Sequence, residues 1–233
     1  MLDKAFNALK SHDWGTDRAV LNPIDEAVVA THGDVAARKQ LEMRLAAVLE
    51  TDVSRDAKDF VCRKLMVIGT AASVPALAAL LRQPDHSHMA RYALERIPVP
   101  EAAQAMRDAL PQLSGTLKVG VIGSLGVRQD TASVPALAHL LGNADTMVAR
   151  AAAFGLGDMR TATAAKMLAK AKPAGAVKSA VTDASLACAE GLLGDGKTVE
   201  ALAIYKGLAH ENQPKHVRLA ATRGMLACAG KKG

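Results

Sequence analysis

The sequence predicts an all-α protein built from stacked helical hairpins, and three observations support this. One stretch occurs twice, 60 residues apart: residues 72–81 read ASVPALAALL and residues 132–141 read ASVPALAHLL. This offset is the length of two helical hairpins, so a hidden hairpin lies between the copies. Alanine and leucine supply most of the apolar side chains and only 3% of residues are aromatic, which favours helices over strands. Signals for helix starts and ends then recur about every 33 residues, a length typical of hairpin repeats.

The N-terminal part predicts two hairpins. Asn22 and Pro23 indicate a helix start, because asparagine caps free N–H groups and proline fits the first turn. Asp34 and Ser54 are the predicted caps of the next two helices. Trp14, the single tryptophan, is expected to cover the exposed end of the stack, since terminal repeats need atypical outer faces.

The duplicated stretch begins the third and fifth hairpins. In its first copy Ser73 is the predicted helix cap, and Pro75 lies in the first turn, where its missing N–H costs nothing. The expected buried stripe has the spacing of one helix face and consists of Val74, Leu77, Leu80 and Leu81.

Glycines mark the second helices of several hairpins. The hidden hairpin has Gly120 and Gly123 inside its second helix, with Gly126 just past the end. Each interior glycine costs about 1 kcal/mol relative to alanine, which is tolerable if neighbouring helices approach closely there. The second helices of the last three hairpins align without gaps and place small residues at equivalent positions, with glycine at Gly155, Gly191 and Gly224.

No linker interrupts these elements, so the chain is expected to be one continuous domain, residues 1–233. The predicted parts are an N-terminal cap hairpin at 1–33, repeats at 34–70, 71–100, 101–130, 131–160 and 161–196, and a C-terminal repeat at 197–233.

Hydropathy and cysteine usage limit the class of protein. The longest weakly polar run, Val119–Val127, is less than half of the roughly 20 residues that cross a bilayer, and the N-terminus has no apolar signal-peptide core. We therefore expect no membrane span and a cytoplasmic protein. The cysteines Cys62, Cys188 and Cys228 have no metal-binding spacing and are expected to be buried small hydrophobic residues.

The repeated motifs resemble the HEAT-like repeats, especially the short class found in phycobilisome lyases. The resemblance is strongest over residues 71–160. The residues that carry it are Ser-Val-Pro-Ala-Leu at 73–77 and 133–137, Asp145 with Val148-Ala149-Arg150-Ala151-Ala152 and Leu156-Gly157, and Val217-Arg218-Leu219-Ala220-Ala221.

This resemblance implies a right-handed α-solenoid, a superhelix of about seven antiparallel helical hairpins whose second helices line the concave face. Most members of the family bind proteins, and a minority are enzymes or bind nucleic acid. The motifs specify a structural repeat and no reaction.

Four cations on the second helices are candidate partner-binding residues. Arg91 and Arg150 occupy equivalent positions, and Lys118 and Arg218 lie one position earlier in their own hairpins. One interpretation is a cationic strip along the concave groove for a carboxylate or phosphate. The other is an internal ladder, in which Asp85 and Asp145 cap their helices and pair with the following arginines.

The excess positive charge lies in the last third of the chain. Residues 1–160 hold 18 basic and 18 acidic residues, whereas residues 161–233 hold 11 and 5. Solvated outer faces, an acidic protein partner and nucleic acid all remain open as explanations, although Tyr205 is the single aromatic available there for base stacking. These basic side chains include Lys166, Lys170, Lys172, Lys178, Lys206, Lys215, Arg218, Arg223, Lys231 and Lys232.

No motif predicts a catalytic residue, a metal or a cofactor. His86 and His88 are two apart in a turn, and His139 lies two repeats away, so further metal ligands do not converge on them. His210-Glu211 resembles the His-Glu pairs of deoxyhypusine hydroxylase, but that family uses several such pairs and here there is one.

The leading hypothesis is a non-enzymatic scaffold or adaptor that binds a protein or peptide, of acidic character, in the concave groove. One alternative is a lyase-type enzyme or enzyme subunit that acts on a tetrapyrrole-like ligand. Another is nucleic-acid binding through the basic C-terminal third.

Overall fold

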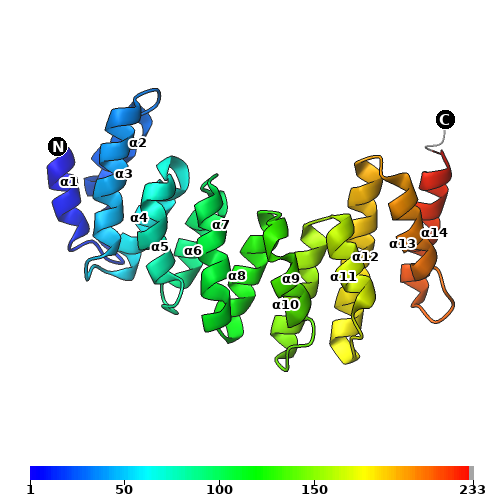
Figure 1. The fold of residues 1–233 in the computed structure, drawn as a ribbon. Coiled ribbons are helices and arrows are strands. Elements are labelled where there is room, and N and C mark those ends of the chain that lie inside the picture. The colour runs from blue at the N-terminus through cyan, green and yellow to red at the C-terminus, as the bar shows by residue number, and fades with distance from the viewer. Residues whose placement is uncertain (231–233) are drawn as a thin grey trace. The chain divides into compact units, whose positions relative to one another are not determined.

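The computed structural model describes residues 1–230, and these form helices joined by short turns (Figure 1). Within this part of the chain there are fourteen α-helices, four short 3-10 helices and no β-strand. Each predicted hairpin contains one pair of α-helices, which we call its first and second helix. The all-α class and the solenoid of antiparallel hairpins are therefore confirmed. Lys231 and Lys232 lie outside the described residues.

Contacts within the chain divide it into two compact units, Met1–Leu113 (unit 1) and Ser114–Gly233 (unit 2). The division falls at the turn inside the predicted hairpin 101–130. That all seven hairpins form one domain stays a prediction. None of the described helices is both long and apolar enough to span a bilayer.

Unit 1 contains seven α-helices in its described residues. In chain order its elements are α1 (Leu2–Leu9), the 3-10 helix η1 (Arg18–Leu21), α2 (Asn22–Ala30), α3 (Val35–Leu49), α4 (Arg55–Ile68), η2 (Ala71–Ser73), α5 (Val74–Leu80), α6 (Ser87–Arg96), α7 (Pro100–Ala109) and η3 (Leu110–Gln112). The first helices α3, α5 and α7 pack in succession, and the second helix α4 packs on α6.

Two predicted helix caps in unit 1 are confirmed and two are wrong. The carboxylate of Asp34 accepts from Ala37 N at 2.9 Å, and the hydroxyl of Ser54 accepts from Ala57 N at 3.0 Å. Asn22 is not a cap: η1 leads directly into α2, so Leu21 precedes the helix. Ser73 holds the cap position, but its hydroxyl donates to Thr70 O at 3.1 Å. The helix nevertheless begins as expected, with Pro75 in its first turn and all four residues of the predicted stripe buried.

Trp14 does not cover the end of the stack. Its side chain is 91% exposed, in the turn between α1 and η1. Phe6 and Leu9 of α1 and Ile24 of α2 are buried in this hairpin instead, so the N-terminal layer has its own apolar contacts without the tryptophan.

Unit 2 also has seven α-helices in its described residues. They are α8 (Gly115–Val127), α9 (Val134–Leu140, preceded by η4, Thr131–Ser133), α10 (Thr146–Asp158), α11 (Ala162–Lys170), α12 (Gly175–Gly194), α13 (Thr198–Leu208) and α14 (Lys215–Gly230). The second helices α8, α10, α12 and α14 pack in succession, and the first helix α9 packs on α11.

Small residues bring these second helices close together, as the sequence predicts. A Cβ added at Gly126 would lie 2.9 Å from the Cα of Gly155, and one at Gly157 would lie 2.9 Å from the Cα of Ala184. Gly126 lies inside α8, which extends to Val127, rather than past its end. The three aligned glycines meet different neighbours, because Gly155 faces Ile122 and Leu137, Gly191 faces Arg160, and Gly224 faces the ring of Tyr205.

Candidate functional site

The four predicted cations are divided between the two units, so a strip through all four stays a prediction. Arg91 belongs to unit 1, whereas Lys118, Arg150 and Arg218 belong to unit 2. Within unit 2 the gap-free alignment of second helices puts Leu186 of α12 at the position of Arg150. In this alignment α12 contributes an apolar residue at the position where α10 has its arginine.

Arg91 of α6 is half-buried and donates to His88 Nδ1 at 2.7 Å. Burial lowers the pKa of its guanidinium, and Glu95 opposes this shift. The His88 ring also stacks on Tyr92, with ring centroids 6.3 Å apart. Arg91 is thus held in a local polar cluster on α6.

The internal ladder predicted in unit 2 is not formed. Asp145 caps α10 as expected, accepting from Met147 N at 2.9 Å. Arg150 is exposed, and no hydrogen bond or ion pair to it occurs in the described part of the chain. Its guanidinium is therefore available to a partner.

Lys118 and Arg218 differ from Arg150 because of their register. Lying one position earlier, they align with Ala149, which is fully buried in α10. Both side chains are accordingly half-buried, and Arg218 Nε is buried without a hydrogen-bond partner. Sequence alignment alone predicts the offset but not its consequence, which is that these two cations lie deeper than Arg150.

Exposed apolar side chains surround Arg150, and no sequence motif marks them as exposed. Met147, Arg150 and Phe154 are three and four residues apart on α10, so they share one helix face. Met147 is 53% exposed and Phe154 is 43% exposed. On α14, Leu219 aligns with Arg150 and is 56% exposed. We call the exposed residues of α8, α10, α12 and α14 the second-helix face of unit 2.

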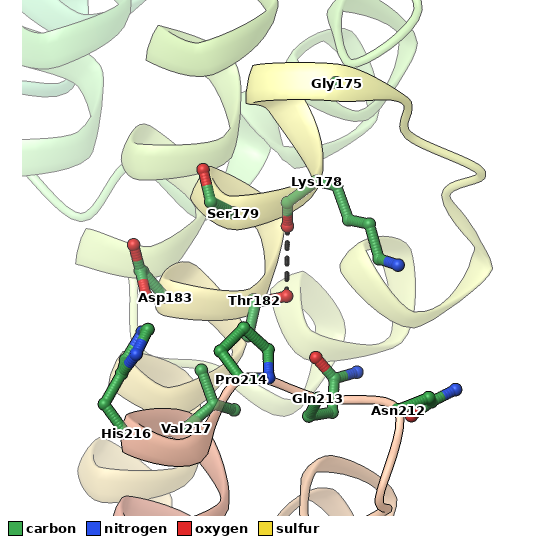
Figure 2. A pocket seen from close by; sticks show the side chains of 10 residues that line it. All are labelled: Gly175, Lys178, Ser179, Thr182, Asp183, Asn212, Gln213, Pro214, His216 and Val217. Carbon is green, nitrogen blue, oxygen red and sulfur yellow. Dashed lines mark hydrogen bonds between the residues drawn. The ribbon is translucent and has the colours of Figure 1, made fainter.

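A polar cleft of about 470 Å³ lies between α12 and the start of α14 (Figure 2). The N-terminal half of α12 forms one wall, and the turn before α14 with that helix's first residues forms the other. Asp183 and His216 lie toward one end in Figure 2, and Lys178 and Asn212 lie toward the other. The Thr182 hydroxyl is used within the helix, donating to Lys178 O at 3.0 Å.

This cleft contains both signs of charge, so it fits a polar or zwitterionic group better than a simple anion. Its lining includes residues of the turns that precede α12 and α14, at 172–175 and 212–214. Both turns precede second helices, and successive second helices have the same direction. The repeat pattern of the sequence therefore contains the signal that these two turns are neighbours in the fold.

The basic residues of the last third are spread over both kinds of helix. Lys166 and Lys170 lie on α11 and Lys206 on α13, which are first helices, whereas Lys178 and Arg223 lie on the second helices α12 and α14. All five are exposed. This scatter agrees with solvated outer faces and does not produce a single basic track.

The cysteine thiols are expected to be inert in the folded protein. Burial raises the pKa of Cys62 to about 12, with a further contribution from Asp59, and burial raises the pKa of Cys188 to about 11. The thiolate is the reactive form, so at about pH 8 neither residue should be alkylated by iodoacetamide until the chain unfolds. Mass spectrometry of samples labelled with and without denaturant measures this; rapid labelling of either cysteine in the native protein would contradict it.

Among residues 1–230, no three histidine, cysteine, aspartate or glutamate side chains are grouped so as to hold a metal ion. His86 and His88 have separate partners, because His86 Nδ1 lies 3.0 Å from Gln83 Oε1 and His88 Nδ1 accepts from Arg91.

Two solved structures are similar to this chain. One is an archaeal HEAT-like repeats protein from Thermococcus onnurineus NA1, with 16% identity, 98% of this chain and 92% of that chain covered, and a TM-score of 0.44. The other is human deoxyhypusine hydroxylase, with 17% identity, 98% and 96% coverage, and a TM-score of 0.39. No protein-family model and no curated protein matches the sequence.

Proposed function

We propose that the protein is a non-enzymatic scaffold that binds a protein or peptide partner through its second helices. The observation that carries this proposal is the group of exposed apolar residues around Arg150 on the second-helix face of unit 2. Met147 and Phe154 flank that arginine on α10, and Leu219 lies at the equivalent position of α14. Aromatic and arginine side chains dominate binding energy at protein interfaces, and exposed apolar groups in such a setting mark binding surfaces.

Rigidity of the supporting layer favours this role. The close approaches of Gly126 to Gly155 and of Gly157 to Ala184 fix the second helices against one another. A surface that is already ordered loses little conformational entropy when it binds. The preferred partner carries apolar anchors for Phe154 and Met147 and carboxylates for Arg150.

In this proposal the other predicted cations contribute less to binding than Arg150. Lys118 and Arg218 add positive potential from half-buried positions of unit 2. Arg91 belongs to a separate surface of unit 1, where Arg63, His88 and Tyr92 line a pocket of about 330 Å³ between α4 and α6. That surface offers the partner a second region of contact.

Affinity capture with three immobilised proteins tests the proposal. The wild type is compared with an Arg150→Ala/Phe154→Ala variant and with a His139→Ala/Val199→Ala control, whose residues are exposed on the first helices α9 and α13. We expect partners retained by the wild type and the control to fall about tenfold with the first variant. The proposal fails if all three proteins retain the same partners to the same extent.

A variant with Arg91, Lys118, Arg150 and Arg218 all changed to alanine separates charge from apolar contact. Loss of the partners from the Arg150→Ala/Phe154→Ala variant with retention by this four-residue variant would assign binding to Phe154. Loss from both, with retention by Phe154→Ala alone, would assign it to the cations.

A further inference from the structure

The polar cleft between α12 and the start of α14 contains charged groups that the protein itself leaves unpaired (Figure 2). Lys178 and Asp183 of α12 line it, and Asn212 and His216 line the opposite wall. All four side chains are exposed, and none of them forms a hydrogen bond or ion pair in the described part of the chain. The cleft therefore offers free ionic and hydrogen-bonding groups to a molecule that enters it.

The two charges of α12 lie at opposite ends of this cleft. Lys178 and Asp183 are five residues apart, whereas side chains meet on a helix at spacings of three and four, so they do not neutralise each other. Their Cα atoms are about 7.5 Å apart along the helix axis. Asn212 lies toward the lysine end in Figure 2, and His216 lies toward the aspartate end. An occupant that reaches both charges must therefore hold its own charges several ångströms apart.

The middle of the cleft is less polar than its ends. The hydroxyls of Ser179 and Thr182 donate to carbonyl oxygens of their own helix at 3.0 Å, so both are already bonded. Pro214 and Val217 line the cleft from the other wall and lie between its two ends in Figure 2. A short hydrocarbon chain complements this middle part.

We propose that this cleft binds a linear zwitterion, a molecule with a carboxylate at one end and an ammonium group at the other. The carboxylate pairs with Lys178 and accepts from the Asn212 amide. The ammonium group pairs with Asp183, and the hydrocarbon chain between them lies on Pro214 and Val217. Charge-assisted bonds of this kind are stronger than those between neutral groups. This is the chemistry of an ω-amino acid and of a lysine residue with a free carboxylate.

This site is additional to the partner-binding residues proposed above. The cleft opens on the second-helix face of unit 2, but Met147, Arg150 and Phe154 do not line it. An Arg150→Ala/Phe154→Ala variant should therefore bind the zwitterion as the wild type does. The two proposals can fail independently of each other.

Other small ligands fit less well. A simple anion is attracted by Lys178 but repelled by Asp183, and a simple cation meets the reverse. A metal ion needs further ligands, and no three histidine, cysteine, aspartate or glutamate side chains among residues 1–230 are grouped to hold one. An α-amino acid such as glycine carries its two charges too close together to reach both ends.

Titration of the wild-type protein with 6-aminohexanoate tests this proposal. The extended chain of this probe places its nitrogen about 7 Å from its carboxylate carbon. NMR chemical shifts of the protein amides give both the affinity and the residues affected. We expect the largest shifts at residues of the cleft. Hexanoate and hexylamine, which carry one charge each, should bind about tenfold more weakly.

Two substitutions remove the charges of the cleft one at a time. Lys178→Met should weaken 6-aminohexanoate about tenfold, to the affinity of hexylamine, and Asp183→Asn should weaken it about tenfold, to the affinity of hexanoate. Lys215→Met and Glu190→Gln are the matched controls, because both residues are exposed on the same pair of helices and neither lines the cleft. The controls should change the affinity by less than about twofold. Thermal unfolding checks that all four variants fold.

Three results would overturn the proposal. The first is that 6-aminohexanoate causes no saturable shift at the cleft, and the second is that hexanoate or hexylamine binds the wild type as tightly. The third is that the two cleft variants bind the probe no more weakly than the two controls do.

Comparison of lysine with Nα-acetyl-lysine distinguishes two sources of the ligand. Tighter binding of the acetylated form, which resembles the last residue of a peptide, would assign the cleft to a chain that ends in lysine. Tighter binding of lysine itself would assign the cleft to a free amino acid.

Discussion

Replacing Glu42 by alanine is expected to lower the free energy of unfolding by about 3 kcal/mol. The side chain is 1% exposed, and its Oε1 accepts from Thr70 N at 2.6 Å and from Ser73 N at 3.1 Å. The Thr70 hydroxyl donates to the same carboxylate at 2.9–3.0 Å. Alanine would remove the acceptor of the Thr70 N–H, would leave the Ser73 N–H with only its bond to Thr70 O, and would release the turn before α5 from α3. Urea denaturation followed by circular dichroism measures the change.

A Glu42→Gln variant is the matched control for this prediction. Its amide oxygen can still accept from both backbone N–H groups, and its amide nitrogen can donate to the Thr70 hydroxyl. We therefore expect a loss of about 1 kcal/mol, well below that of the alanine variant. Equal urea midpoints for Glu42→Ala and the wild type would show that the carboxylate does not hold this turn in solution.

The importance of Glu42 could not be predicted from the sequence. Leu41 and Leu45 have the spacing of one buried helix face and are buried, but a glutamate beside them has the pattern of a polar residue at the edge of that face. Its partners lie 28 and 31 residues away, in a turn whose own signals predict only a serine cap. Arg38 is similar, since its Nε donates to Ile68 O at 3.0 Å and closes the end of α4. Polar contacts between hairpins join residues far apart in the sequence, so no local sequence pattern predicts them.

The order of helices could be predicted because it depends on local information. Turn residues and apolar spacing give every helix pair, and the duplicated stretch gives the period. Predictions were wrong where a neighbouring element, and not the local sequence, determines how a helix begins. The 3-10 helix η1 leads directly into α2, so no Asn22 cap is needed there. The exposure of Trp14 has the same cause, because Phe6, Leu9 and Ile24 already bury the first layer.

The candidate site was less predictable because it depends on register. The sequence gives the one-position offset of Lys118 and Arg218, but only the packed helices show that this offset places them beside the buried Ala149 position. The exposure of Phe154 could not be predicted, because helical spacing does not show which side of a second helix the neighbouring hairpins leave uncovered.

Replacing Gly126 by alanine is expected to lower the free energy of unfolding by about 2 kcal/mol, although alanine is the better helix former. The new Cβ would lie 2.9 Å from the Cα of Gly155 and 3.2 Å from its carbonyl oxygen. Both are backbone atoms of α10, so relief requires the two helices to move apart. That movement would also disturb the packing of Ile122 and Leu137 against Gly155. Thermal and urea unfolding provide the measurement.

Gly123→Ala in the same helix should have the opposite sign. A Cβ at Gly123 meets no atom within 4 Å, so alanine there gains helix propensity without a clash and should raise stability by about 0.5–1 kcal/mol. Two identical substitutions three residues apart would then differ by about 3 kcal/mol, and local helix propensity cannot produce that difference. If both variants gained stability, α8 and α10 would not be in close contact in solution. The rigid layer on which the proposed second-helix binding face depends would then lose its physical basis.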